Sequence, residues 1–229
     1  MTRYALPPPP QASVAIDDSD VRFAVRRIFC VGRNYADHIR EMGSDPGTSR
    51  PVFFSKPADA LVADGASIPY PPGTEDFHHE AELVAAIGVG GRDIAADAAL
   101  AHVWGYAAGN DLTRRDLQAR AKDSRSPWDM AKGFDNSAVC GALRPASVAG
   151  HPSRARILLA VNGAVRQQAD ISQMIWTVPQ LIAELSALVT LAPGDLIFTG
   201  TPAGVGPLVR GDVCRVDVDG VGSVTTTIR

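Results

Sequence analysis

Residues 78–88 read His-His-Glu-Ala-Glu-Leu-Val-Ala-Ala-Ile-Gly. Turn-forming residues flank this apolar run, at positions 69–73 before it and at positions 88–91 after it. A run of this length between such breakers predicts a buried β-strand. Side chains two residues apart on a strand point to the same face, so Glu80 and Glu82 are expected to project together. On a helix, the same two side chains would diverge by roughly 200°.

Two carboxylates on an otherwise apolar strand cost free energy unless they are paired with a cation or bind a metal ion. The strand therefore has two interpretations. Either it lies at a sheet edge where the two glutamates face water, or Glu80 and Glu82 are two ligands of one ion. These residues alone do not distinguish the two.

Composition sets the class of protein. The chain has 229 residues, 45% hydrophobic and 21% charged, with a formal net charge of -3, which is typical of one ordinary globular domain. No Lys/Arg run occurs, which argues against a nucleic acid or an anionic membrane as partner. No apolar run approaches the roughly 20 residues of a membrane span.

The cysteines and the first residues predict the compartment. Cys30, Cys140 and Cys214 are odd in number and form no C-x-x-C pair, so neither a disulfide framework nor a thiolate zinc site is expected. Residues 1–10 contain a proline tract and no apolar segment of the signal-peptide kind. We therefore expect a cytoplasmic protein in which Cys30 and Cys214 are buried and unreactive.

A short helix is expected at residues 34–43, with Asn34 as its N-cap and Gly43 as its stop. His38 and Glu41 are three residues apart and would share a face. They are either a solvated ion pair on a surface helix or a general base with its orienting carboxylate. The polar residues 44–50 that follow predict a mobile loop.

The remaining pattern alternates short strands with scattered helices, which predicts an α+β, mainly β fold. Asp111 follows a buried segment and is either a helix N-cap or a further metal ligand. Lys132 is expected in a loop. The other expected elements are strands at 28–32, 51–57, 196–198 and 212–229, helices at 95–104, 112–118 and 178–191, a hairpin around 162–163, and a glycine-rich loop at 199–206 that lacks the phosphate-loop lysine.

Glu80, Glu82 and Asp111 together offer hard oxygen ligands without a thiolate. This set suits Mg²⁺ or Mn²⁺, or Ca²⁺, better than Zn²⁺. Lys132 and Arg115 supply positive charge that suits a carboxylate or an enolate. The combination indicates metal-assisted chemistry on a small, oxygen-rich acid.

From about Arg26 to its C-terminus, the chain resembles the fumarylacetoacetate hydrolase family. The motifs that carry the resemblance are Gly32–His38 with Glu41, His79–Glu82, Asn110–Thr113 with Arg115–Gln118, Ala131–Phe134 and Thr199–Pro202. Residues 53–60 and 68–72 are most similar to the single-domain members that hydrolyse fumarylpyruvate. We expect an N-terminal arm at residues 1–24 and the catalytic domain at residues 25–229.

The resemblance implies a mixed β-roll, a homodimer, and a divalent ion held by Glu80, Glu82 and Asp111. It also implies that His38 and Glu41 lie on a segment that closes over the ligand. Positions that hold the substrate in the family correspond here to Arg115, Gln118, Lys132 and Thr201. Arg33 or Arg40, which flank His38, is the candidate partner for a second carboxylate of the substrate.

The expected activity is cleavage of a C–C bond in a 2,4-dioxo acid, with fumarylpyruvate giving fumarate and pyruvate, as in gentisate-type degradation of aromatic compounds. His38, oriented by Glu41, would activate the attacking water, and Lys132 would lie near the departing enolate. Two alternatives remain, an acylpyruvase or oxaloacetate decarboxylase with the same machinery and a catalytically silent binding protein. The intact His38–Glu41 pair disfavours the silent protein.

Overall fold

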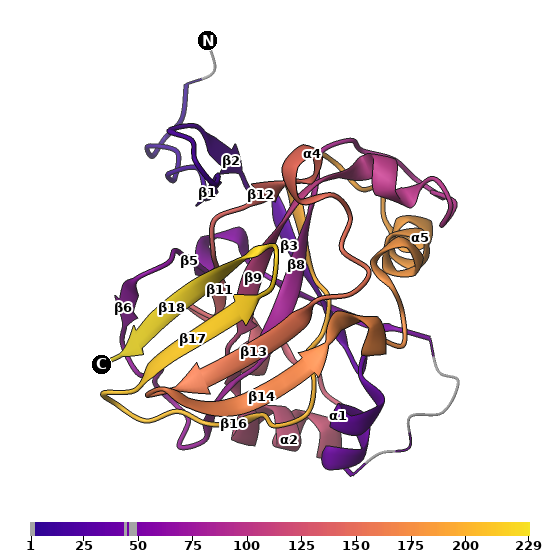
Figure 1. Ribbon diagram of the computed structural model, residues 1–229. Helices are drawn as coiled ribbons and strands as arrows, with labels where there is room; N and C mark the ends of the chain where they lie inside the picture. Colours follow the sequence, from indigo (N-terminus) through magenta and orange to yellow (C-terminus); the bar gives the residue numbers. More distant parts are fainter. Residues whose placement is uncertain (1–2, 44, 46–49) are drawn as a thin grey trace.

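The structure, a computed structural model, describes residues 3–43, 45 and 50–229. The loop expected at residues 44–50 therefore lies largely outside the described residues. The centre of the molecule is a large mixed sheet (Figure 1). Its strands, in order, are β4 (Val52–Lys56), β3 (Arg27–Gly32), β15 (Asp195–Phe198), β8 (Ala81–Ile87), β9 (Val103–Asp111), β11 (Ala138–Cys140) and β5 (Leu61–Val62), with β12 (Arg144–Pro145) also paired to β9.

This large sheet curls into a roll. Its two outermost strands, β4 and β5, are joined by residues 57–60 alone. A connection of that length spans at most roughly 17 Å, so the two ends of the sheet must come close together. The expected α+β, mainly β roll is confirmed.

A second sheet packs against the roll. It contains β14 (Ala164–Asp170), β13 (Arg156–Val161), β17 (Val213–Val218), β18 (Gly222–Ile228) and β6 (Ala66–Ile68). Along β17, buried and more exposed residues alternate, as expected for a strand with one face on the core. Every residue of β8, by contrast, is buried, because apolar groups cover both of its faces. The apolar run at residues 81–87 follows from this double burial.

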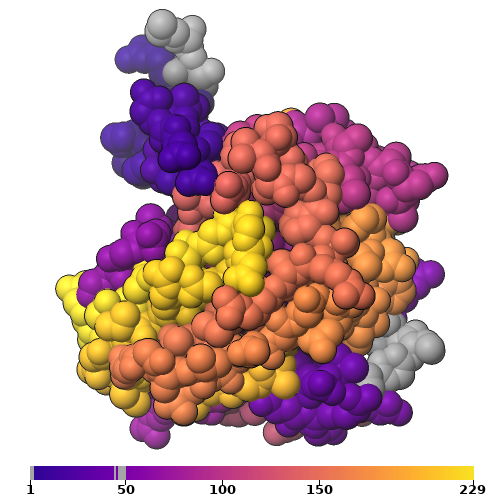
Figure 2. All heavy atoms as spheres, in the orientation of Figure 1, coloured from indigo at the N-terminus to yellow at the C-terminus, as the bar shows by residue number. Residues whose placement is uncertain are grey.

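Two smaller sheets complete the fold. Beside the roll lies a three-stranded sheet in which β7 (Phe77–His79) pairs with β10 (Thr113–Arg114) on one side and with β16 (Gly206–Pro207) on the other. Near the N-terminus, β1 (Ser13–Ala15) and β2 (Arg22–Ala24) form a hairpin that stands out from the body (Figures 1 and 2). The hairpin is attached through Val14 and Val25, which are buried with Ile28 and Leu196 of the large sheet.

The helices lie around the sheets. They are α1 (Ala36–Glu41), α2 (Arg115–Asp123), α3 (Asp129–Lys132), α4 (Ala146–Ala149), α5 (Val178–Leu188) and the 3-10 turns η1 (Ala58–Ala60), η2 (Ala99–His102) and η3 (Ile171–Gln173). Helix α5 begins with a capping box between Thr177 and Gln180 and buries Leu181, Ile182 and Leu185 in the core. None of the helices in the described part of the chain is both long and apolar enough to cross a membrane.

Three expectations about local structure are wrong, and so is one alternative that the sequence left open. The helix expected at residues 95–104 is only the short η2, and Val103 and Trp104 begin strand β9. Tertiary pairing with β8 overrides the helical spacing there. Lys132 ends helix α3 instead of lying in a loop. Asn34 is no N-cap, because α1 starts after Tyr35. Asp111 is no N-cap either, because Arg114 precedes α2.

The packing of the second sheet on the roll predicts a stability effect. Leu159 on β13 is fully buried in the core, so Leu159→Ala leaves a cavity. We expect it to lower the free energy of unfolding by about 2–5 kcal/mol, as measured by urea titration of the purified protein. Val165 on β14 is 53% exposed, and Val165→Ala is expected to change stability by about 0.5 kcal/mol or less. Equal losses in the two variants would contradict this packing.

Candidate metal centre and catalytic pocket

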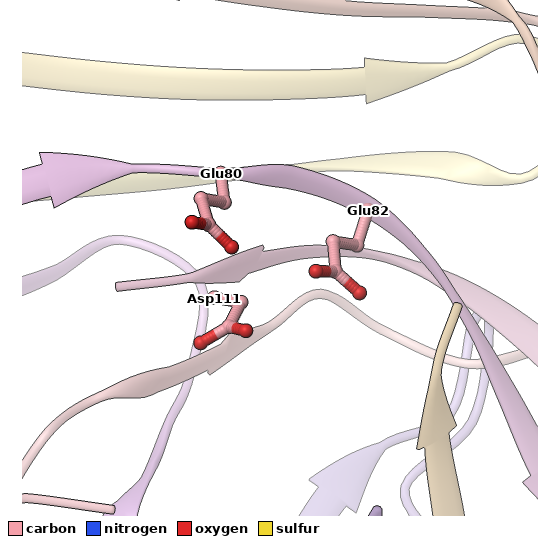
Figure 3. Close-up of side chains that lie close together, drawn as sticks. All are labelled: Glu80, Glu82 and Asp111. Carbon is pink, nitrogen blue, oxygen red and sulfur yellow. The ribbon is translucent and has the colours of Figure 1, made fainter. Parts of the chain in front are cut away.

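Three buried carboxylates meet at one end of the roll. Each of Glu80, Glu82 and Asp111 offers an oxygen within 4.8 Å of the others, and in Figure 3 the three side chains converge on one space. Glu82 comes from β8 and Asp111 from the end of β9. Glu80 and Glu82, which were expected on one strand, thus meet Asp111 from the neighbouring strand β9.

Glu80 lies in a break between β7 and β8, whereas one continuous strand was expected there. The backbone groups at this break are still paired. The Glu80 amide donates to Asn110 Oδ1 at 2.8 Å, and the Asp111 amide donates to the Glu80 carbonyl at 2.9 Å. The break therefore ties Glu80 to the end of β9, beside Asp111.

Three cations surround the carboxylates. Lys132 Nζ lies 2.7 Å from Glu80 Oε2, 2.9 Å from Asp111 Oδ2 and 2.7 Å from Thr113 Oγ1. On the other side of Asp111, Lys56 Nζ is 2.7 Å from Oδ1. Arg115 donates to Glu80 Oε1 at 2.5 Å. Because lysine and arginine are almost never fully buried without partners, these cations and carboxylates depend on one another.

The pKa values of Glu80 and Glu82 shift in opposite directions although the two side chains are neighbours. Burial would raise the pKa of Glu80, but Lys132 and Arg115 outweigh burial and lower it. The pKa of Glu82 is raised well above its usual value by burial, then by the charges of Asp111 and Glu80. In the described part of the chain no cation forms an ion pair with Glu82. It accepts instead from the Gly200 amide at 2.7 Å.

Gly200 is required at that position. Its φ of +98° is left-handed, and a Cβ there would lie 2.7 Å from Cβ of Asn34. The Asn34 side chain donates to the carbonyls of Thr199, at 2.7 Å, and Trp176, at 3.0 Å. Asn34 thus joins the segment before α1 to the loop that holds Glu82.

Lys56 and Gln167 are contributors that sequence reasoning missed. Lys56 is fully buried at the end of β4 and, besides its ion pair, donates to the carbonyls of Leu112 and Lys132. A lysine closing an apolar strand was the available signal. Gln167 Oε1 accepts from the Ala81 amide at 3.0 Å, and its Nε2 donates to Thr201 Oγ1 at 2.8 Å. Gln167 lies far away on hairpin strand β14, and no local pattern indicates it.

A pocket opens over Glu80. Arg115, Gln118, Lys132 and Thr201 line it, as do His38 and Arg33. The structure thus places these six predicted residues around one space. Arg115 also donates to Gln118 Oε1 at 2.6 Å, which fixes both side chains on α2.

The predicted pair on α1 forms at the same pocket. His38 Nδ1 lies 3.1 Å from Glu41 Oε2, and Glu41 Oε1 accepts from the Gly204 amide at 3.0 Å. Burial lowers the pKa of His38, and the charge of Glu80 and the Glu41 hydrogen bond only partly oppose this effect. His38 is buried and lines the pocket, so the alternative of a solvated surface pair does not describe it.

Arg33 and Arg40, the two candidates for a second substrate carboxylate, differ in placement. Arg40 is exposed and pairs with Asp37 at 2.6 Å, and it is not among the residues that line the pocket. Arg33 lines the pocket and has a left-handed φ of +63°. Of the two, only Arg33 is in position to meet a ligand.

Comparison with known proteins assigns the family. The family described as "Fumarylacetoacetate (FAA) hydrolase C-terminal" matches residues 27–229. The chain belongs to the fumarylacetoacetate hydrolase family. One relative is fumarylpyruvate hydrolase from Ralstonia sp, 41% identical over 80% of this chain and 95% of that protein. Another is the mitochondrial oxaloacetate tautomerase FAHD1 of Mus musculus, 41% identical over 89% of this chain and 92% of that protein.

A solved member of the fumarylacetoacetate hydrolase family superposes along almost the whole chain. It is fumarylpyruvate hydrolase from Pseudomonas aeruginosa in complex with Mn²⁺ and pyruvate, with a TM-score of 0.97, 50% identity and 99% coverage of both chains. The predictions of the family and of an enzyme of this family are confirmed.

The carboxylates fit the divalent ion that the family implies. Glu80 and Asp111 already have cationic partners, whereas the burial and like charges around Glu82 favour a proton on it. A divalent ion bound by the three groups would favour the ionised form of Glu82 and relieve the repulsion among them. Mg²⁺ or Mn²⁺ therefore suits this all-oxygen set.

Metal binding can be tested without an activity assay. An ion that binds only the folded state raises stability, by about 2.7 kcal/mol at a hundredfold excess over Kd. We expect Mn²⁺ to raise the melting temperature of the chelator-treated protein and Glu82→Gln to remove most of that rise. Glu75 is exposed, so Glu75→Gln is the matched control and should keep it. An equal Mn²⁺ response in Glu82→Gln and wild type would contradict this ligand set.

Proposed function

We propose that this protein hydrolyses a 2,4-dioxo acid, fumarylpyruvate, to fumarate and pyruvate. The observation that carries the proposal is that His38, which contacts Glu41 through Nδ1, lines the same pocket as the buried Glu80 and Lys132. The relatives named as fumarylpyruvate hydrolases support it, one of them with Mn²⁺ and pyruvate bound. A homodimer, a cytoplasmic location and a role in aromatic degradation stay predictions.

The deep end of the pocket would bind the pyruvyl part of the substrate. A divalent ion bound there supplies a Lewis acid that polarises the substrate's keto oxygen. Arg115 and Gln118, buried and joined to each other, present hydrogen-bond donors at the same end. Bound in this way, the substrate keeps its C4 carbonyl toward His38.

His38 would remove a proton from the attacking water. Its Nδ1 is engaged by Glu41, and in the described residues Nε2 has no hydrogen-bond partner, so Nε2 is the atom available to the water. The lowered pKa keeps the imidazole neutral near pH 7. Glu41, itself held by the Gly204 amide, stabilises the imidazolium that forms.

Water would add to C4, and the C3–C4 bond would then break with its electron pair leaving as pyruvate enolate. The proton taken by His38 returns to C3, so one water is consumed and fumarate and pyruvate are released. Lys132 donates all three of its ammonium hydrogens to Glu80, Asp111 and Thr113. It therefore supports the enolate through its charge and by fixing the carboxylates.

Oxaloacetate tautomerisation is a second candidate, because relatives with that name are equally similar. That reaction moves a proton at C3 and needs no attacking water. The discriminating experiment is a panel of fumarylpyruvate, acetylpyruvate and oxaloacetate with Mn²⁺. It follows pyruvate release for hydrolysis and decarboxylation, and the enol absorbance for tautomerisation. Fumarylpyruvate is expected to give the highest kcat/KM, and a preference for oxaloacetate would overturn the proposal.

Removal of the base gives a second test. His38→Ala is expected to lower kcat for fumarylpyruvate by about 10²- to 10⁴-fold, because a general base contributes that much. Its Mn²⁺-induced rise in melting temperature should match that of wild type, since His38 is not a metal ligand. Hydrolysis near the wild-type rate would show that His38 is not the base.

The pH profile tests the pair as a unit. The acidic limb of kcat/KM should lie below the usual His pKa of about 6.5, because burial lowers the pKa of His38. Glu41 raises that pKa through its hydrogen bond and charge, so Glu41→Gln should move the limb to still lower pH while reducing the plateau. If the acidic limb of the kcat/KM profile stays in place or moves to higher pH in Glu41→Gln, it cannot report the titration of His38.

A further inference from the structure

Two cations at the outer part of the pocket lack an ion-pair partner among the residues that the structure describes. Arg115 and Lys132 are buried and direct their charges to Glu80, and Lys132 also pairs with Asp111. Arg33 is exposed and Lys122 half-buried, and both line the pocket. Neither of them has an ion pair with a carboxylate in the part of the chain that the structure describes. Their charges are therefore available to a ligand.

Lys122 is placed by helix α2. Arg115, Gln118 and Lys122 follow one another at spacings of three and four residues, so they share one face of the helix. Lys122 lies seven residues beyond Arg115, which is about 10 Å along the axis. A ligand held at Glu80 and Arg115 by one end thus extends along this face toward Lys122.

The ammonium group of Lys122 lies against an aromatic surface. Lys122 Nζ is 5.6 Å from the centre of the Trp128 ring, within range of a cation–π contact. Trp128 and Phe54, whose ring centres are 5.8 Å apart, both line the pocket. This surface suits a flat, conjugated chain that ends in an anion.

The electrostatics around Lys122 and Arg33 favour the binding of an anion. Burial lowers the pKa of Lys122, the nearby positive charges of Arg115 and Arg33 lower it further, and the charge of Glu80 opposes this shift only in part. The backbone of Arg33 adds to this, because its left-handed φ of +63° is a strained conformation for a residue with a Cβ. Backbone strain of this kind recurs at ligand-binding sites.

We propose that Lys122, together with Arg33, forms the subsite for the carboxylate that lies farthest from the metal centre. Lys122 thereby determines specificity for dicarboxylic dioxo acids over monocarboxylic ones. The inference rests on the proposed function and deepens it, since it selects fumarylpyruvate over acylpyruvates through a residue outside the metal centre and the His38–Glu41 pair.

The test compares two substrates in the Mn²⁺-loaded enzyme. Lys122→Met keeps the length of the side chain and removes its charge. It is expected to raise KM for fumarylpyruvate by about 10- to 100-fold, as for loss of a hydrogen bond to a charged group. KM for acetylpyruvate, which lacks the distal carboxylate, should change by less than about twofold. Arg33→Met should show the same selectivity, and Lys122→Arg should restore most of the fumarylpyruvate affinity.

Arg120 provides the matched control on the same helix. It is exposed, lies near Asp116, and is not among the pocket residues, so Arg120→Met should leave both KM values unchanged. Equal losses on both substrates in Lys122→Met, or none on either, would overturn the subsite. An equal rise in KM for fumarylpyruvate in Arg120→Met would also overturn the subsite. It would show that the effect comes from surface charge in general and not from the position of Lys122.

A binding measurement separates failure of the subsite from failure of the proposed function. If the wild type hydrolyses neither dioxo acid, the proposed function fails, and calorimetry still measures fumarate binding to the protein with Mn²⁺ and pyruvate. Weaker fumarate binding in Lys122→Met by about tenfold or more supports the subsite. Equal binding in the two proteins, or no binding to either, overturns it.

Discussion

The contact between the Lys132 ammonium and the carboxylates of Glu80 and Asp111 is the interaction on which the site depends. Glu80, in the break between β7 and β8, and Asp111, at the end of β9, are both buried, so without a shared cation they would repel each other at high cost. Lys132, with Lys56 and Arg115 beside it, makes their convergence stable. Glu82 has no such partner among the described residues, and this asymmetry leaves room for one divalent ion.

The sequence predicted those parts of the site that a local pattern carries. Glu80 and Glu82 alternate on an apolar run, and His38 and Glu41 share one helical turn, so periodicity was sufficient to group them. Asp111, Lys132 and Arg115 were also candidates from the residues alone, and the family resemblance added Gln118 and Thr201 as substrate-holding positions. For the fold, short breaker-bounded strands were enough to indicate a mainly β domain.

Contacts between distant segments could not be predicted in this way. Gln167 reaches Thr201 and Ala81 from a separate hairpin, and Lys56 meets Asp111 only because the sheet curls. Alanine-rich spacing at residues 95–104 suggested a helix, but pairing with β8 extends β9 into it. Lys122 carries no motif, and only its place on α2 beside Trp128 relates it to the pocket.

The closure of the roll through residues 57–60 couples local opening of the sheet to the metal centre. Lys56 is both the last residue of β4 and the counter-ion of Asp111. Fraying of the edge strands would therefore remove the partner of a candidate metal ligand in the same event. By thermodynamic linkage, ion binding should then slow the exchange of the backbone amides of β4 with solvent. Metal binding at the carboxylates and protection of the β4 amides from exchange would be two measures of one equilibrium.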